Sequence, residues 1–510
     1  MEKKVRVRFA PSPTGPLHMG GVRTALFNYL FARKHGGDFL LRIEDTDQTR
    51  FVPGAENYII ESLKWCGLIP DEGVGFGGEY GPYRQSERKA IYKQYADQLV
   101  AGGNAYYAFD TPEELNDLRT VAEAEKRTFS YDVHTRAGLK NSLSLSPGEV
   151  TERMNRGDAY VIRFKMPENH NVTETDLIRG EVTFNTNILD DKVLFKSDGM
   201  PTYHLANVVD DHLMKITHVI RGEEWLSSMP LHILLYEALG WAGNRPRFAH
   251  LPLILKPTGK GKLSKRDGDK MGFPVFPLLW TDPETGDVSR GYREDGYFPE
   301  AFINLLALLG WNAGNDQEFF SMDELIESFS LERVVKSGAR FDPEKAKWFN
   351  RHYLQQKSAS ELANLFLPVL TEKNIHAPAE KIIRVIELVK DRCDFVADFW
   401  KNSDYFFVAP ESYDETTIRK KWKEDTSEKL QAIVEVFRSV PEWKYDTIKD
   451  VFSAFMTEKE WSFGMVMVPI RLALVGSSTG VDLFDICELI GKDETIARVQ
   501  KAIDTIGVAK

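Results

Sequence analysis

The sequence predicts a multidomain α/β protein, in which a doubly wound parallel-sheet domain is split by an α+β insert and followed by an all-helical region. Alternating strand, glycine-bearing loop and helix patterns occupy the start of the chain and return after Pro201, as in βαβ units. The stretch between these two parts mixes strand and helix patterns. From about residue 341 onward, the apolar residues recur at helical spacing.

The first βαβ unit is the clearest of these patterns. VRVRF at 5–9 alternates apolar and basic residues, which indicates a strand, and a loop rich in proline, serine and glycine follows it. A helix then begins near Gly20 or Gly21, and a second strand at 39–43 ends beside Glu44. Ligands of such sheets bind at the carboxyl ends of the strands, so we expect a site there.

The later segments define the other regions. The insert shows strands at 160–166 and 181–188, and the α/β pattern resumes with a strand at 218–225, a helix at 227–241 and a strand at 252–256. A polar, turn-rich stretch at 280–296 predicts an exposed hairpin or loop. We expect residues 1–98 and 201–256 to form the two halves of one Rossmann-like domain, with 99–200 as the insert between them. We expect a loop and a small domain at 257–342 and the helical region at 343–510.

The composition excludes several classes of protein. The net charge is -11, so an RNA partner would have to contact a locally basic surface. The three cysteines are scattered and include no CxxC pair, which argues against a disulfide framework or a cysteine zinc site. The most apolar stretches, 301–311 and 465–476, are too short to span a bilayer, and no signal peptide is apparent. We therefore expect a cytoplasmic protein.

PSPTGPLHMGG at 11–21 joins the first strand to the first helix. Gly20 and Gly21 allow the backbone to approach a ligand closely, and free N–H groups at a helix start bind phosphate. His18 adds a donor that can be neutral or cationic near neutral pH. A motif this short, taken alone, is more often a turn with a surface histidine.

KLSKR at 262–266 places Lys262 and Lys265 on a glycine-flanked basic loop. Lysines on such a loop can close over a triphosphate and offset the charge on departing pyrophosphate. A solvated lysine run is the more common explanation of this segment alone. The two motifs together point to nucleotide chemistry, since both follow strands of one domain.

With these motifs the sequence resembles the class I aminoacyl-tRNA synthetases, and among them the glutamyl-tRNA synthetases of the bacterial and organellar type. The resemblance covers essentially the whole chain and includes RFAPSPTG, LFNYLFAR, LRIEDTD, PTYHLANVVDDH, HVIRGEEW, KLSKRDGDK and RLALVGSSTG. It implies a glutamate–tRNA ligase, which converts glutamate and ATP to glutamyl-adenylate and transfers glutamate to the 3′ end of tRNA(Glu). The family's first signature usually ends in histidine, but here Gly21 stands there, as is common in glutamate enzymes. Backbone N–H groups or His18 must then replace that contact.

The resemblance assigns site residues, and substrate chemistry agrees with part of the assignment. An ammonium requires a carboxylate such as Glu44, and the carboxylates of glutamate suit arginine forks such as Arg8 and Arg221. The implied glutamate-binding residues are Arg8, Ala10, Ser12, Glu44, Tyr203, Asn207 and Arg221. The implied ATP-binding residues are His18, Gly20, Gly21, Glu224, Trp225, Lys262, Leu263, Ser264 and Lys265. His18, Lys262 and Lys265 are the expected catalytic residues, with Lys265 the strongest choice.

Several of these residues could have purely structural roles instead. Glu44 and the arginines could form surface ion pairs, and Tyr203 and Trp225 could be core aromatics.

The resemblance also implies cofactors and partners. We expect ATP with Mg²⁺, and no metal site in the protein; some relatives carry a cysteine zinc site in the insert, but Ala108 and Asp110 stand where cysteines would be expected. The expected partners are tRNA(Glu), L-glutamate and ATP, with no membrane, and the expected state is a monomer. The insert would contact the acceptor arm, 257–342 the stem, and 343–510 the anticodon.

Other functions remain open. A glutaminyl-tRNA synthetase is the nearest, although a neutral amide would leave Arg221 unpaired. An enzyme that also charges tRNA(Gln) with glutamate is a second possibility. A small-molecule nucleotidyltransferase shares the first motif but lacks a long helical half, and an inactive RNA-binding relative would not need KLSKR.

Overall fold

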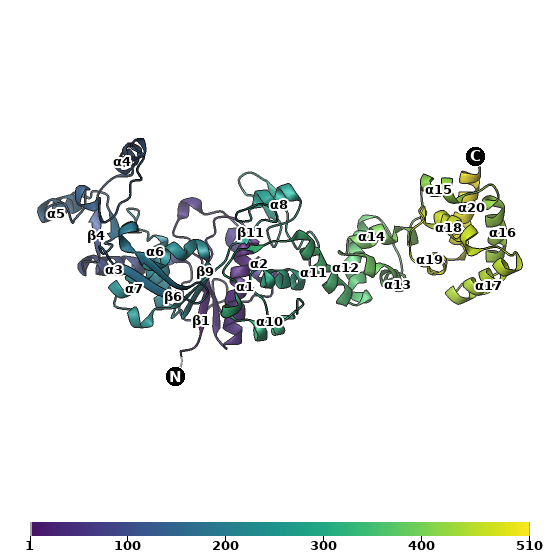
Figure 1. The fold of residues 1–510 in the computed structure, drawn as a ribbon, viewed down its shortest axis with the longest axis horizontal. Coiled ribbons are helices and arrows are strands. Elements are labelled where there is room, and N and C mark those ends of the chain that lie inside the picture. The colour runs from purple at the N-terminus through teal and green to yellow at the C-terminus, as the bar shows by residue number, and fades with distance from the viewer. Residues whose placement is uncertain (1–2, 509–510) are drawn as a thin grey trace. The chain divides into compact units, whose positions relative to one another are not determined.

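The computed structural model describes residues 3–508 and divides the chain into two compact units, Met1–Ala346 and Lys347–Lys510 (Figure 1). The first unit holds the strands together with many helices. The second contains helices only among its described residues. This division into an α/β part and a helical part confirms the fold class that the sequence predicts.

Parallel strands form the centre of the first unit. β1 (Arg6–Phe9), β2 (Asp38–Leu41) and β3 (Glu72–Gly73) pair in parallel, as do β9 (His218–Gly222) and β10 (Arg247–Leu251). β1 and β9 lie side by side, because the N–H of Thr217 donates to the carbonyl of Arg6 at 2.9 Å. The spatial order is therefore β3-β2-β1-β9-β10, and it reverses direction between β1 and β9. Doubly wound sheets bind ligands at this reversal.

Helices cover both faces of these strands (Figure 1). On one face α1 (Met19–Lys34) bonds to β9, since Asn28 Nδ2 donates to the carbonyl of Ile220 at 3.0 Å. On the other face α6 (Tyr203–Leu213) supplies Asp211, which pairs with Arg8 of β1 at 3.0 Å. All of β1 is buried, as expected for a strand covered on both faces. Further helices of this unit are α2 (Ala55–Trp65), α3 (Lys89–Ala101), α7 (Met229–Ala238), α9 (Pro299–Leu308) and α10 (Met322–Ser328).

The insert contains one antiparallel sheet and one hairpin. β4 (Ala105–Ala108), β5 (Val161–Phe164) and β8 (Val193–Phe195) form the sheet, beside which lie α4 (Pro112–Ala124) and α5 (Pro147–Arg156). The hairpin of β6 (Asn171–Asp176) and β7 (Gly180–Asn185) attaches to β10 instead, because the N–H of Leu177 donates to the carbonyl of Phe248 at 2.8 Å. One part of the expected insert therefore buttresses the edge of the central strands.

The KLSKR segment is tied to a short strand. β11 (Ile254–Leu255) pairs in parallel with β14 (Ala339–Arg340), and the N–H of Leu263 donates to the carbonyl of Ile254 at 2.9 Å. α8 (Lys265–Met271) follows directly. β12 (Trp280–Thr281) and β13 (Val288–Ser289) then form the hairpin expected within 280–296.

Sequence reasoning did not identify β10. Its five residues lie between Pro246 and Pro252, which leaves too short a run for a periodic pattern.

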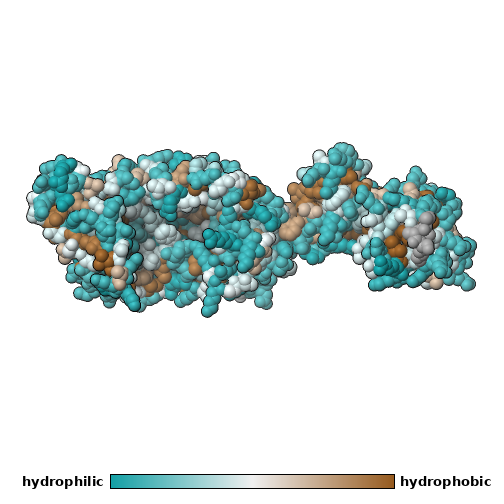
Figure 2. Space-filling model, turned by 90° about the horizontal axis from the view of Figure 1, so that it is seen from above, coloured by the Kyte–Doolittle hydropathy of each residue, from teal (hydrophilic) through white to brown (hydrophobic). Residues whose placement is uncertain are grey.

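The second unit is built from helices, as expected. They are the end of α11 (Pro343–Gln356), α12 (Ala359–Glu372), α13 (Ala379–Val389), α14 (Asp398–Ser403), α15 (Glu415–Lys421), α16 (Thr426–Ser439), α17 (Tyr445–Glu458), α18 (Phe463–Val475), α19 (Leu483–Ile490) and α20 (Lys492–Val508). α16, α18 and α20 pack against one another and contribute fully buried residues such as Val434, Leu472 and Val499. The face drawn in Figure 2 is mostly hydrophilic, with small hydrophobic patches. Within residues 3–508, no helix is long and apolar enough to cross a membrane.

Candidate active site

A pocket of about 480 Å³ opens at the carboxyl ends of β1 and β9, where the strand order reverses. This volume lies in the range typical of small-molecule sites. The structure brings together all seven residues that we expected to bind glutamate. It also brings together seven of the nine expected ATP residues: His18, Gly20, Gly21, Glu224, Trp225, Lys262 and Leu263.

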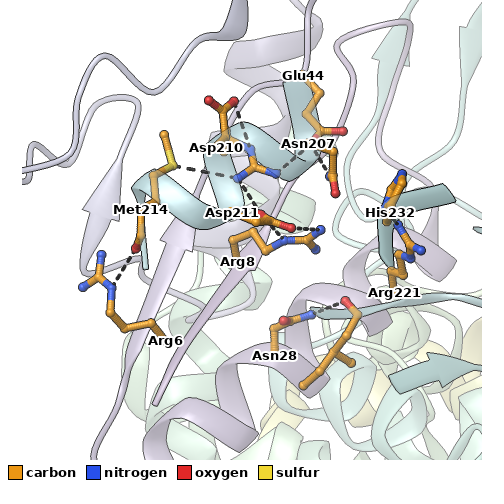
Figure 3. Close-up of polar contacts among 12 residues, drawn as sticks. Arg6, Arg8, Asn28, Glu44, Asn207, Asp210, Asp211, Met214, Arg221 and His232 are labelled. Atoms are coloured by element: carbon orange, nitrogen blue, oxygen red, sulfur yellow. Dashed lines mark hydrogen bonds and ion pairs between the residues drawn. The ribbon is translucent and has the colours of Figure 1, made fainter. Parts of the chain in front are cut away.

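Buried charges support one half of the pocket (Figure 3). The network consists of Arg8, Arg42, Arg88, Glu44, Asp210 and Asp211. Arg8 and Arg42 both pair with Asp211, at 3.0 and 2.7 Å, and Arg42 also pairs with Glu44 at 2.9 Å. The three arginines balance the three carboxylates, and all six residues are at most 8% exposed. The alternative of surface ion pairs for Arg8 and Glu44 is therefore wrong.

Arg8 and Glu44 each keep one atom for a ligand. Arg8 uses Nε and Nη2 to bind Asp211, which leaves Nη1 without a hydrogen-bond partner among residues 3–508. Glu44 accepts from Arg42 and from Asn207, both at Oε1, so Oε2 is the oxygen left for a ligand. Burial raises the pKa of Glu44 above its usual value, against the opposing effect of Arg42 and Arg8. A bound cation would restore the stability of its charged form.

Arg221 lies apart from this network, beside His232 (Figure 3). Its side chain is buried, yet within residues 3–508 it forms no ion pair. Nε donates to His250 Nε2 at 3.0 Å, Nη1 to the Tyr203 hydroxyl at 2.9 Å, and Nη2 to the Trp225 carbonyl at 3.2 Å. All of these partners are uncharged. A buried guanidinium without a counter-ion is costly, which points to an anionic ligand at this position.

Two aromatic residues form the wall beside Arg221. The Trp225 and Tyr203 rings pack with their centroids 4.3 Å apart. Tyr203 is largely enclosed, and burial raises the pKa of its hydroxyl. Trp225 is 40% exposed and lines the pocket, so the alternative of a core tryptophan is wrong.

His18 caps the amino end of α1 in the other half of the pocket. Its Nδ1 accepts from the N–H of Gly20 at 3.1 Å. Burial, and next the charge of Lys262, lower the pKa of His18 to about 4, so the ring is neutral near pH 7. The proton of a neutral ring must then be on Nε2, which is buried and has no partner among the described residues. This N–H is a donor that a ligand can satisfy.

The backbone around Gly20 and Gly21 differs from the expectation. The N–H of Met19 donates to the Val275 carbonyl at 2.8 Å, that of Gly20 to His18 Nδ1, and that of Gly21 to the His18 carbonyl at 2.8 Å. The expectation of free N–H groups for phosphate is therefore wrong, because the chain itself satisfies them. A Cβ at Gly21 would lie 2.5 Å from a methyl carbon of Leu17, so this glycine makes room for a side chain of the pocket wall.

Only the first two residues of the KLSKR segment line the pocket. Lys262 pairs with Glu224 at 2.9 Å, and both side chains are about half exposed. Ser264 and Lys265 do not line the pocket. Ser264 precedes α8 and donates its hydroxyl to Asp267 at 2.6 Å, and Lys265 is the first residue of that helix and is exposed. Pairing with β11 fixes Lys262 and Leu263, whereas the start of α8 directs the chain away.

Sequence reasoning missed several charged residues of the site. Arg23 lines the pocket at 3% exposure and donates to the Leu309 carbonyl at 2.8 Å, and burial lowers its pKa to about 10. Arg42, Asp210 and Asp211 hold the network together. The available signal was a charged residue between apolar residues of the same helix or strand, as in HMGGVRTAL and LANVVDDH.

Comparisons with known proteins agree with this geometry. Residues 4–348 match the family model of "tRNA synthetases class I (E and Q), catalytic domain", and residues 361–503 match "Anticodon binding domain". The glutamate–tRNA ligase of Christiangramia forsetii is 58% identical over 506 residues, which cover 99% of this chain and 100% of that protein. The chain belongs to the glutamate–tRNA ligase family of class I synthetases.

Other members of the glutamate–tRNA ligase family are similarly close. The Bacteroides fragilis ligase is 58% identical, with 99% of each chain covered. A crystal structure of a glutamate tRNA ligase from Elizabethkingia meningosepticum, in complex with its amino acid, superposes with a TM-score of 0.97 at 55% identity and covers 99% of this chain and 100% of that one. Family membership confirms the predicted family, fold class and enzyme class. The roles of individual pocket residues stay predictions.

Proposed function

We propose that this chain activates L-glutamate with ATP and transfers it to the 3′ end of tRNA(Glu). The observation that carries the choice of amino acid is Arg221, a buried cation in the pocket wall without an ionic partner among residues 3–508. The γ-carboxylate of glutamate would supply the missing negative charge. Glutamine would leave the guanidinium unpaired, which costs a few kcal/mol.

The remaining groups of the pocket fit the other end of glutamate. Oε2 of Glu44 would accept from the ammonium, and Nη1 of Arg8 would donate to the α-carboxylate. The Tyr203 hydroxyl accepts from Arg221 and can donate its own proton to the γ-carboxylate. Asn207 holds Glu44 in place, and Ala10 and Ser12 form the neighbouring wall.

The first reaction needs no nucleophile from the protein. An α-carboxylate oxygen of glutamate attacks the α-phosphorus of ATP, the new P–O bond forms, and the bond to the bridging oxygen breaks to release pyrophosphate. The protein would accelerate this step by positioning and by charge neutralisation. The Nε2–H of His18 and the ammonium of Lys262 are the groups placed to do so. Lys265 would act only after its loop moves toward the pocket.

The second reaction transfers glutamate to RNA. The 2′-hydroxyl oxygen of the terminal ribose forms an ester bond with the adenylate carbonyl carbon, the bond from that carbon to the phosphate oxygen breaks to release AMP, and the hydroxyl proton passes to water. We propose that the insert (99–200) contacts the acceptor arm, the 257–342 region the stem, and the 343–510 region the anticodon. We also propose a monomeric, cytoplasmic enzyme.

Mg²⁺ is the cation expected with ATP. This ion favours oxygen ligands and is usually held by substrate phosphates with one or two carboxylates. Glu224, beside Lys262 at the pocket mouth, fits that requirement as a single carboxylate. The ion would supply charge neutralisation on the phosphates. That the protein holds no zinc stays a prediction.

The test is aminoacylation by the purified full-length chain with ATP, Mg²⁺ and tRNA(Glu). We expect charging with glutamate and none with glutamine. Charging with glutamine alone would overturn the proposal, as would an absence of charging with either amino acid. A parallel reaction with tRNA(Gln) and glutamate decides whether the enzyme discriminates between the two tRNAs.

A further inference from the structure

The guanidinium of Arg221 is oriented by a histidine on the neighbouring strand. Arg221 on β9 and His250 on β10 are paired residues in the parallel register. His250 is completely buried, and its Nε2 accepts from Arg221 Nε at 3.0 Å. Nη1 contacts the Tyr203 hydroxyl and, at 3.4 Å, His232 Nδ1, and Nη2 donates to the Trp225 carbonyl, which leaves one N–H of Nη2 for the pocket.

This contact requires one particular tautomer of His250. Nε2 can accept from Arg221 only when it carries no proton, so the proton of the neutral ring must be on Nδ1. Nδ1 lies 2.6 Å from Oδ2 of Asp176, which accepts that proton's hydrogen bond. Burial lowers the pKa of His250, although Asp176 acts against this, so a neutral ring is favoured.

Asp176 is itself immobilised at the end of β6. Its Oδ1 accepts from the backbone N–H groups of Ile178 and Arg179, at 2.9 and 2.8 Å. Burial raises the pKa of Asp176, but the bond from His250 and the backbone bonds outweigh this, and the carboxylate stays charged. Arg179 also donates to the His250 carbonyl at 3.1 Å, so the turn between β6 and β7 holds this histidine at two points.

We propose that His250, held by Asp176, is a positioning residue that orients the Arg221 guanidinium for the glutamate side chain and thereby sets amino-acid specificity. This inference rests on the proposed function and extends it from the pocket wall to the hairpin behind it. His250 does not line the pocket, so its effect on substrate passes through Arg221.

Two substitutions of His250 distinguish the roles of its two ring nitrogens. The amide of glutamine can occupy the place of Nε2, so His250→Gln keeps an acceptor for Arg221 and loses the bond to Asp176. The amide of asparagine reaches only the place of Nδ1, so His250→Asn keeps the bond to Asp176 and loses the acceptor. Both variants retain a polar side chain of similar size.

The experiment measures glutamate and ATP dependence of aminoacylation for the full-length variants. We expect His250→Asn to raise the KM for glutamate about tenfold, the effect of losing one hydrogen bond to a charged group, and to change the KM for ATP less than about twofold. His250→Gln keeps the acceptor for Arg221, so its KM for glutamate should stay within about threefold of the wild-type value. Equal defects in both variants, or parallel changes for both substrates, would overturn the proposal.

A second measurement and a control guard against a loss of folding. His218, at the amino end of β9, the strand that carries Arg221, is a partly buried histidine outside the pocket, so its Asn and Gln variants should leave the KM for glutamate unchanged. In spectra of ¹⁵N-histidine-labelled protein, the signal that disappears in His250→Gln should have its proton on Nδ1, and a proton on Nε2 would overturn the proposal. If the wild-type chain does not charge tRNA with glutamate, the proposed function fails. If it does so and the variants behave otherwise, only the positioning role fails.

Discussion

The two halves of the pocket differ in how firmly the protein holds their charges. In the half that we propose to bind glutamate, called the amino-acid half, Arg8, Glu44 and Arg221 are buried and fixed by several hydrogen bonds each. In the half that we propose to bind ATP, called the nucleotide half, Lys262 and Glu224 have side chains that are 58% and 44% exposed. Charges in a buried, preorganised site interact far more strongly than charges in water. Selection of the amino acid can therefore rest on fixed geometry, whereas neutralisation of the phosphates awaits ATP.

Arg221→Ala should cause the largest loss of activity among the variants that test this difference. We expect the kcat/KM for glutamate to fall about 1000-fold, the cost of truncating one partner of a buried charge pair. The KM for ATP should stay within about threefold, since Arg221 belongs to the half proposed to bind the amino acid. Titration of each substrate in the aminoacylation assay checks this. Arg290→Ala, at a side chain 63% exposed and outside the pocket, is the control that should change neither value. Equal losses for both substrates would mean that Arg221 serves both halves.

Arg42→Met tests the rigidity of the amino-acid half. Arg42 is fully buried and pairs with Asp211, with Glu44 and, at 3.8 Å, with Asp210, so its loss leaves three carboxylates with fewer partners. We expect the free energy of unfolding of the first compact unit to fall by about 3 kcal/mol. Hydrogen exchange of amides in β1 and β9 during urea titration measures it. Arg50→Met, at a side chain 70% exposed, should change it by no more than about 0.5 kcal/mol. Similar losses in the two variants would argue against a special role for the network.

Lys262→Ala tests the exposed half. We expect kcat for adenylate formation to fall about 100-fold, since one cation is lost near the departing pyrophosphate. Stability should change by less than about 1 kcal/mol, because the pair with Glu224 is half exposed. ATP–pyrophosphate exchange in the presence of tRNA measures the rate. Lys260→Ala, on the same loop but outside the pocket, should retain most activity. A large rise in the KM for glutamate would contradict the division of the pocket into two halves.

His18→Gln should give the smallest expected free-energy change of the four variants, a change in the free energy of unfolding that depends on pH. The pKa of His18 is about 4 in the folded protein against an ordinary value of 6.5, so the unfolded chain binds a proton more readily between these pH values. Stability from the neutral ring is therefore complete above pH 6.5 and is lost as the pH falls toward 4. The wild-type advantage over the variant should shrink by about 2 kcal/mol between pH 7 and pH 5. Urea unfolding at both values measures this, and a constant difference would contradict the lowered pKa.

The sequence by itself determined the fold class, the family and most of the pocket. Strand ends near Arg8, Glu44 and Arg221 are visible as periodic patterns, and the carboxyl ends of parallel strands meet at one edge of a sheet. All seven expected glutamate residues therefore line the pocket. Local patterns carry this information because alternation and motif order do not depend on distant contacts.

Only the tertiary structure decided which groups have partners. The N–H groups of Gly20 and Gly21 are engaged, and Lys265 lies outside the pocket wall. Arg221 donates to His250, on a strand that sequence patterns did not reveal. Such pairings join residues that are far apart in the chain, as Arg8 and Asp211 are. The free atoms that define a binding site are those that remain after these long-range hydrogen bonds have formed, and no local pattern encodes them.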